Sequence, residues 1–135
     1  MRYRLVPGLL SERTIECDDT HHKLVVNLHL VPLSVTQYKL VAALLRQRQR
    51  WEKDTEDQVP LILTVQRLQE VAGLTRRKDV KKYLFYASAR LESQELRIAC
   101  IHGYGYAIFH VAELEGEAPT GAPHPPASAT FSRFP

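Results

Sequence analysis

Residues 64–111 read TVQRLQEVAGLTRRKDVKKYLFYASARLESQELRIACIHGYGYAIFHV, and this stretch decides the fold. Thr64 is a typical N-cap of a short helix that ends at Gly73. A longer helix is predicted over 78–92, because apolar residues recur there at helical spacing. Two strands joined by a tight HGYG turn are predicted to follow: 96–101 and 106–111. This order predicts a helix-turn-helix with a hairpin wing beside its second helix.

The two helices of this unit each have one apolar face, which we expect to point into the core. Four residues form that face on the shorter helix: Val65, Leu68, Val71 and Ala72. Four more form it on the longer helix: Val80, Leu84, Ala87 and Leu91.

The segment LSVTQYKLVAALLRQR, residues 33–48, predicts a helix upstream of this unit. Ser34 and Gln37 have the spacing of a capping box at its start. Its apolar surface is wider than one stripe, so we expect neighbours on two sides: Tyr38, Leu40, Val41, Ala42, Leu44 and Leu45. The polar run 46–58 predicts the helix end and an exposed loop, with Trp51 folded back onto the domain.

Short runs of β-branched and aliphatic residues predict strands before this helix, and the polar segment DDTHH predicts a hairpin between the last two: RYRLV (2–6), RTIEC (13–17) and KLVVN (23–27). Pro60–Leu63 is a further short strand candidate. The sheet precedes the helices and does not alternate with them. The fold class is therefore predicted as α+β, a winged helix-turn-helix with an N-terminal antiparallel sheet, three helices and a C-terminal β-hairpin wing.

A length of 135 residues fits one domain, which we place at residues 1–112. Residues 113–135 contain many prolines and few aliphatic residues, so we expect a flexible tail. Three glutamates and one arginine give this tail a net charge of −2, and the chain total of +3 therefore leaves +5 on the domain. A basic domain favours an anionic partner.

Several classes of protein are disfavoured by composition and motifs. The apolar runs are too short to cross a bilayer, and no signal peptide is recognisable, so we expect a cytoplasmic protein. Phosphate-binding and nucleophile motifs are missing, and we expect neither an enzyme nor a cofactor. Cys17 and Cys100 are interpreted as core positions in a reducing compartment, and the scattered histidines do not have the spacing of a metal site.

The start of the longer helix is the main candidate interface. Residues 76–82 carry five cations and one aspartate, a net charge of +4. Such a run is often simply a solvated surface, but cations at a helix N-terminus oppose the helix dipole, a cost that solubility alone would not favour. Phosphate contact accounts for the run better. The candidate residues here are Arg76, Arg77, Lys78, Lys81 and Lys82.

Two further groups could extend this interface. Phe85 and Tyr86 are predicted on the outer face of the longer helix, where Tyr86 could reach base edges. His102 and Tyr104 are predicted near the tip of the wing, where they could contact a phosphate or a minor groove. Tyr106 is expected to pack onto the core.

The sequence resembles the effector domains of OmpR/PhoB-type response regulators over about 14–111. LSVTQYKLVAALL is similar to their LTPTEFRLLELLL segment, and CIHGYGYAIF is similar to their TVRGVGYRL wing. The resemblance implies a winged-helix fold and DNA binding. It also carries Arg90 into the candidate interface, because this residue and Leu91 match the end of the family's third helix.

The departures from this family are informative. No receiver domain fits in this sequence, so phosphorylation-driven activation is not implied. Ala87 and Ser88 stand where a leucine and an arginine are expected, and His102 replaces the wing arginine. The link before the third helix, which in the family can touch RNA polymerase, is short here. A polymerase contact and a homodimer are both left open.

The sequence therefore predicts sequence-specific binding of duplex DNA by a winged-helix transcriptional regulator, with helix 78–92 in the major groove and the wing at 101–106 on the backbone. Two alternatives are kept. One is a winged-helix protein-interaction module, self-associating or docking a partner, that uses Phe85, Tyr86 and the wing. The other is a binder of single-stranded nucleic acid that stacks bases on its tyrosines.

Overall fold

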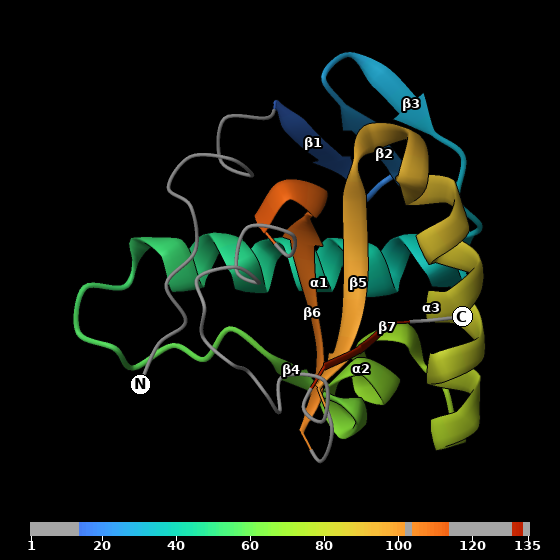
Figure 1. The fold of residues 1–135 in the computed structure, drawn as a ribbon. Helices are drawn as coiled ribbons and strands as arrows, with labels where there is room; N and C mark the ends of the chain where they lie inside the picture. The colour runs from blue at the N-terminus through green and yellow to red at the C-terminus, as the bar shows by residue number, and fades with distance from the viewer. Residues whose placement is uncertain (1–13, 102–103, 114–130, 134–135) are drawn as a thin grey trace.

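The computed structural model describes residues 14–101, 104–113 and 131–133. In chain order the elements are β1 (Ile15–Asp18), β2 (Lys23–Val26), β3 (His29–Val31), α1 (Val35–Lys53), β4 (Leu63–Thr64), α2 (Val65–Ala72), α3 (Arg77–Leu91), a 3₁₀ turn (Glu92–Gln94), β5 (Leu96–Ile101), β6 (Gly105–His110) and β7 (Phe131–Arg133). They form two antiparallel sheets, with strand orders β1-β2-β3 and β4-β6-β5-β7. Helix α1 crosses the β5–β6 hairpin, and α3 runs beside β5 (Figure 1). The predicted α+β class is confirmed.

The N-terminal sheet contains a strand, β3, that was not predicted from the sequence. The predicted hairpin is confirmed as β1 and β2, but a two-residue turn then leads into β3, with Val26 opposite His29. Asn27 and Leu28 both have positive φ, 50° and 69°, as a tight hairpin turn requires. Leucine rarely adopts this conformation, so this turn was not predicted from the sequence. The predicted strand 2–6 lies outside the described residues.

Helix α1 begins and ends as predicted. The Ser34–Gln37 capping box is present in both directions, at 3.0 and 3.2 Å. The helix continues to Lys53, so it ends inside the polar run 46–58, and the exposed loop begins only at residue 54. The reason is that Arg48 and Trp51 lie on the inner face, where they are only 2% and 7% exposed.

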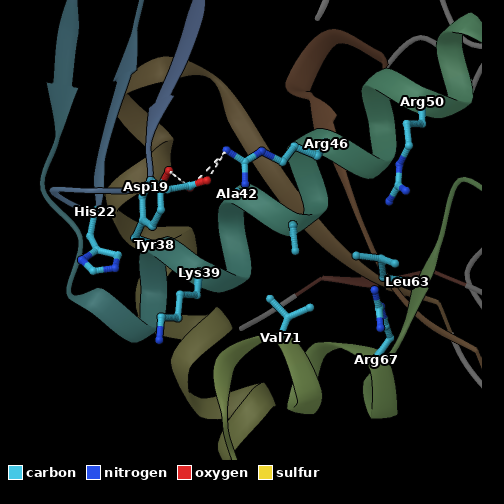
Figure 2. Close-up of a pocket in the computed structure, with 11 residues that line it drawn as sticks. Asp19, His22, Tyr38, Lys39, Ala42, Arg46, Arg50, Leu63, Arg67 and Val71 are labelled. Atoms are coloured by element: carbon cyan, nitrogen blue, oxygen red, sulfur yellow. Dashed lines mark hydrogen bonds and ion pairs between the residues drawn. The ribbon is translucent and has the colours of Figure 1, made fainter.

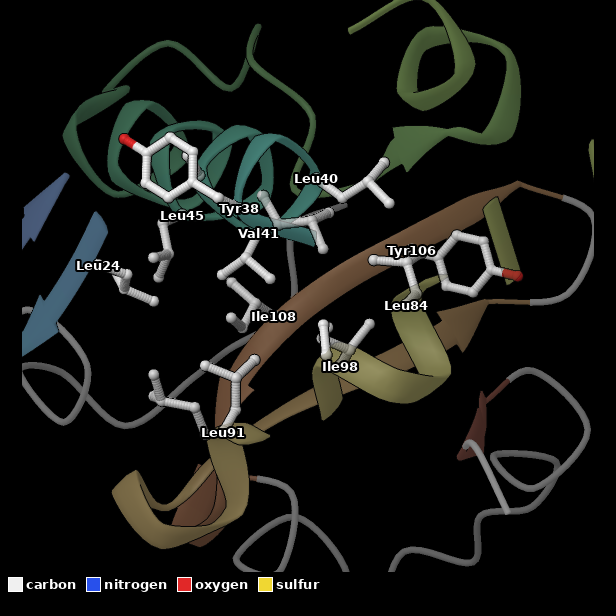
Figure 3. Packing of buried hydrophobic residues seen from close by; sticks show 14 of the residues in the cluster. Leu24, Tyr38, Leu40, Val41, Leu45, Leu84, Leu91, Ile98, Tyr106 and Ile108 are labelled. Atoms are coloured by element: carbon white, nitrogen blue, oxygen red, sulfur yellow. The ribbon is translucent and has the colours of Figure 1, made fainter. Parts of the chain in front are cut away.

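The main core lies between α1, the two shorter helices and one face of the β5–β6 hairpin (Figure 3). All four residues predicted for the inner face of α3 are fully buried, and Tyr106 packs into the same core as expected. On α2, Leu68 and Ala72 are buried, whereas Val65 and Val71 are half-buried. Both cysteines are free thiols, half-buried against this core.

The second face of the β5–β6 hairpin is covered by a smaller core that centres on a buried cation. Here the apolar residues are Trp51, Leu61, Ala99, Ala107 and Phe109. The guanidinium of Arg48 lies 5.6 Å from the ring of Trp51, donates to the Ile108 carbonyl at 3.1 Å and pairs with the buried carboxylate of Glu113. Glu52 contacts the same guanidinium at 2.9 Å. The charge is therefore compensated on several sides.

Two parts of the predicted tail contact the domain. Glu113, the first residue of that tail, is 1% exposed because it pairs with Arg48. Strand β7 pairs with β5, with Phe131 opposite Ile101. The boundary at residue 112 itself remains a prediction.

Removing Glu113 should show how much the buried pair contributes. Glu113→Ala leaves the Arg48 guanidinium buried without its main partner, so we expect the free energy of unfolding to fall by about 3 kcal/mol. The double variant Arg48→Met/Glu113→Leu removes both charges and should recover most of that loss. Urea denaturation of the three proteins measures this, and a double variant as unstable as Glu113→Ala would contradict the expectation.

Gly105 and Gly73 form a matched pair for testing the junction of β4 and β6. A Cβ on Gly105 would lie 1.9 Å from the carbonyl oxygen of Leu63, whereas a Cβ on Gly73 would meet nothing within 4 Å. Gly105→Ala must therefore displace β4, and we expect a loss of at least about 2 kcal/mol. Gly73→Ala has only the strain of a φ of 71° and should cost about 1 kcal/mol. Equal losses in thermal unfolding would argue against close packing at Gly105.

Candidate nucleic-acid interface

Capping interactions define both ends of α2. The hydroxyl of Thr64 accepts from the N–H of Arg67 at 3.1 Å, which confirms Thr64 as the N-cap of α2. Gly73 ends the helix in the left-handed conformation, and the N–H of Leu74 donates to the Gln69 carbonyl at 2.9 Å. Because α3 begins at Arg77, the link between the helices is short. Two helices joined so tightly form the predicted helix-turn-helix.

The five cations predicted at the start of α3 are all on the surface, and we call them the cationic end of α3: Arg76, Arg77, Lys78, Lys81 and Lys82. Arg76 is held by Asp79 through two hydrogen bonds of 3.0 and 3.2 Å. No described residue forms an ion pair with any of the three lysines. Lys78 and Lys82 lie on the face opposite the buried stripe and Lys81 on its flank, and all three are exposed and available to an anion.

The wing formed by β5 and β6 packs against α3 through β5. Its turn is closed by the N–H of Tyr104, which donates to the Ile101 carbonyl at 3.0 Å, and Tyr104 is 67% exposed. Burial, with a smaller contribution from Cys100, raises the pKa of Tyr106 to about 12, and nearby Arg77 opposes the shift. Arg77 is thus close to the base of the wing. His102 lies outside the described residues.

Tyr86 and Arg90 are on the surface of α3 beyond the cationic end. Tyr86 lies one turn beyond Lys82 on the same face of the helix, and on the side opposite Arg77, which it follows by nine residues. Arg90 is about 18 Å from Lys78 along the axis. Tyr86 is 49% exposed and contacts Phe85 edge to face, with ring centroids 5.6 Å apart. The structure therefore places the five cations together at the start of α3, Tyr86 further along the face that Lys78 and Lys82 share, Tyr104 on the wing and Arg90 near the end of the helix.

Sequence reasoning missed a carboxylate that joins the N-terminal sheet to α1. Asp19 belongs to the polar segment DDTHH that predicted the hairpin, and it accepts from the Tyr38 hydroxyl at 2.6 Å and from Arg46 at 3.0 and 3.1 Å. These bonds, that of Tyr38 first, lower the pKa of Asp19. Partners 19 and 27 residues away leave no local signal in the sequence.

Other kinds of site find little support in the described part of the chain. No group of three or more histidine, cysteine or acidic residues there could hold a metal ion. None of the helices described is long and apolar enough to cross a membrane.

Comparison with solved structures identifies the fold. The DNA-binding domain of the response regulator AdeR, solved in complex with an intercistronic region, superposes with a TM-score of 0.51 at 21% identity, over 70% of this chain and 90% of that one. The chain has the fold of a response-regulator DNA-binding domain. The OmpR/PhoB-type winged helix expected from the sequence is thus confirmed at the level of fold.

Two larger proteins contain the same fold. One, from streptococci, is described as a redox sensor that evolved from two-component response regulators (TM-score 0.52, 18% identity, 82% of this chain and 44% of that one). The other is a point mutant of RitR (TM-score 0.50, 20% identity, 73% and 41%). The chain therefore spans less than half the length of these two. No protein-family profile matches the sequence, and no curated protein does.

Proposed function

We propose that this protein binds duplex DNA through the cationic end of α3 and the adjoining wing, and regulates transcription. The observation that carries the proposal is the group of three exposed lysines at the start of the second helix of a helix-turn-helix, none of which forms an ion pair with a residue that the structure describes. In this fold that helix is the one that enters a major groove. Because the protein acts on DNA, the proposal also places it in the cytoplasm.

The arrangement assigns different tasks to different residues. The cations at the start of α3 neutralise phosphates at the groove edge and set the orientation of the protein. Lys82 and Tyr86 lie one and two turns further along, where they reach base edges. Tyr104 and His102 contact the adjacent backbone from the wing. A histidine there would strengthen the contact on protonation.

Charge reversal at two lysines tests the location of the interface. Lys78→Glu/Lys82→Glu should weaken binding to a random-sequence duplex at least a hundredfold, measured by fluorescence anisotropy at low salt. Lys23→Glu/Lys53→Glu makes the same change in net charge at two exposed lysines outside the proposed interface and should leave affinity within about fivefold. Thermal unfolding confirms that both variants fold. Equal losses in the two variants would show that net charge alone drives binding.

The salt dependence supplies an independent readout. If the wild-type protein releases about one counterion per cation contacted, log K falls with log salt with a slope of about −0.9 for each phosphate neutralised. Four or five contacts thus predict a slope near −4, and the lysine reversal should flatten it. A wild-type slope near zero would argue against the phosphate backbone as the main partner.

The exposed aromatic pair favours one alternative, a protein-interaction module. Phe85 and Tyr86 are 39% and 49% exposed, unusually large apolar side chains for a solvated helix face. If the protein is such a module, Phe85→Ser/Tyr86→Ser should abolish self-association or partner docking, and neither the wild type nor any variant should bind DNA. Under the DNA proposal the protein binds duplex, and the aromatic double variant retains most of the affinity and changes which sequences are selected.

A further inference from the structure

A pocket of about 330 Å³ lies on another part of the surface, between α1 and α2 (Figure 2). Its walls come from the outer stripe of α1, from α2 and from the turn between β1 and β2. Four cations line it: Lys39, Arg46, Arg50 and Arg67. Neither Tyr104 nor any residue of α3 lines the pocket, so it is distinct from the interface proposed above.

Helical spacing gathers these cations. On α1, Lys39, Arg46 and Arg50 are separated by seven and four residues, so all three lie on one face of the helix. Arg67 faces them from α2 (Figure 2). Between the two helices the lining is small and apolar: Ala42, Ala43, Leu63 and Val71. The pocket is therefore a shallow apolar floor with a cationic rim.

One end of the pocket already holds a carboxylate. Asp19 is seated against the Arg46 guanidinium at 3.0 Å and the Tyr38 hydroxyl at 2.6 Å. This contact shows how the pocket can bind a carboxylate, because a guanidinium and a hydroxyl, both from α1, donate to the same group. Both donors are engaged by the chain itself, so an incoming group must use the remaining cations.

The remaining cations are weakly compensated. The Arg50 guanidinium donates to a neutral amide oxygen, that of Gln47, at 2.7 Å. Arg67 has an exposed pair with Glu70 at 3.3 Å, an interaction worth little in water. Within the described residues, Lys39 has no acidic partner. Three cations thus surround an apolar floor with at most one exposed carboxylate opposed to them.

The shape decides which anion fits. The phosphates of duplex DNA lie on a wide convex surface, which is too large to enter this pocket, whereas an extended peptide can enter it. A peptide whose carboxylates alternate with small apolar side chains would satisfy both the rim and the floor. We propose that this pocket docks an acidic, partly apolar segment of a partner protein.

The partner would sit next to the DNA. Leu63 belongs to β4, which pairs with β6 at Tyr106, so one end of the pocket lies close to the base of the wing. A protein held there could contact the machinery assembled on the same duplex. Docking does not depend on DNA being bound, so it can be tested separately.

The test uses a fluorescein-labelled peptide of alternating glutamate and leucine, with a peptide of alternating glutamine and leucine as its control. We expect the full chain to bind the glutamate peptide and not the glutamine peptide in an anisotropy titration. Arg50→Glu/Arg67→Glu should weaken binding at least tenfold. Lys78→Glu/Lys82→Glu makes the same change in charge on α3 and should leave peptide binding within about twofold while DNA binding is lost. This contrast separates failure of the pocket from failure of the proposed function.

Four results would overturn the proposal. The first is that Arg50→Glu/Arg67→Glu binds the peptide as the wild type does, or loses no more affinity than Lys78→Glu/Lys82→Glu, when both variants retain the wild-type thermal midpoint. The second is loss of DNA affinity in Arg50→Glu/Arg67→Glu as severe as that in the α3 variant, which would make the pocket part of the DNA surface. The third is binding of tripolyphosphate in place of the peptide. The fourth is a dimer, seen by sedimentation, that only the pocket variant disrupts.

Discussion

The structure depends on burial of the apolar surface of α1 in two cores. Most of this surface packs against α2, α3 and the inner face of the β5–β6 hairpin, and the last turn of the helix contributes Trp51 to the smaller core on the outer face. Only a helix that continues to Lys53 can do this, because Trp51 lies in its last turn. Since α2 and α3 both pack on α1, their mutual angle, and with it the outward direction of the lysines, follows from this packing.

Burial of Arg48 is the unusual consequence of this arrangement. A helix that crosses a sheet must place whatever residue falls at the crossing in the interior, and here it is an arginine. Two carboxylates, a carbonyl and two aromatic rings surround it. Burying the guanidinium without partners would cost several kcal/mol of stability, but here its partners compensate the charge. Because one of them is the Ile108 carbonyl of β6, these bonds also fix the position of α1 along β6. Through its pair with Arg48, Glu113 is held against α1.

Prediction from sequence succeeded where the signal is local. The capping box at Ser34, the N-cap Thr64, the stop at Gly73 and the buried stripe of α3 are each encoded within a few residues, and all were confirmed. It failed where the signal is distant or atypical. Arg48 appeared as one more residue of a polar run because its partner is 65 residues away, and β3 depends on a leucine with positive φ. The same limit hid the pocket, since Arg67 faces α1 only after folding.

The cations of this chain show why charge alone is a poor guide to function. Arg48 is buried as a structural centre, Arg46 and Arg76 are engaged by aspartates, and Lys78 remains exposed. In the sequence all four are equivalent contributions to a net charge of +3. Only the environment separates them, because an arginine already paired within the chain gains little from a new anion, whereas an unpaired lysine releases a counterion when a phosphate arrives. The surface that we propose for DNA binding therefore consists of cations that folding leaves exposed.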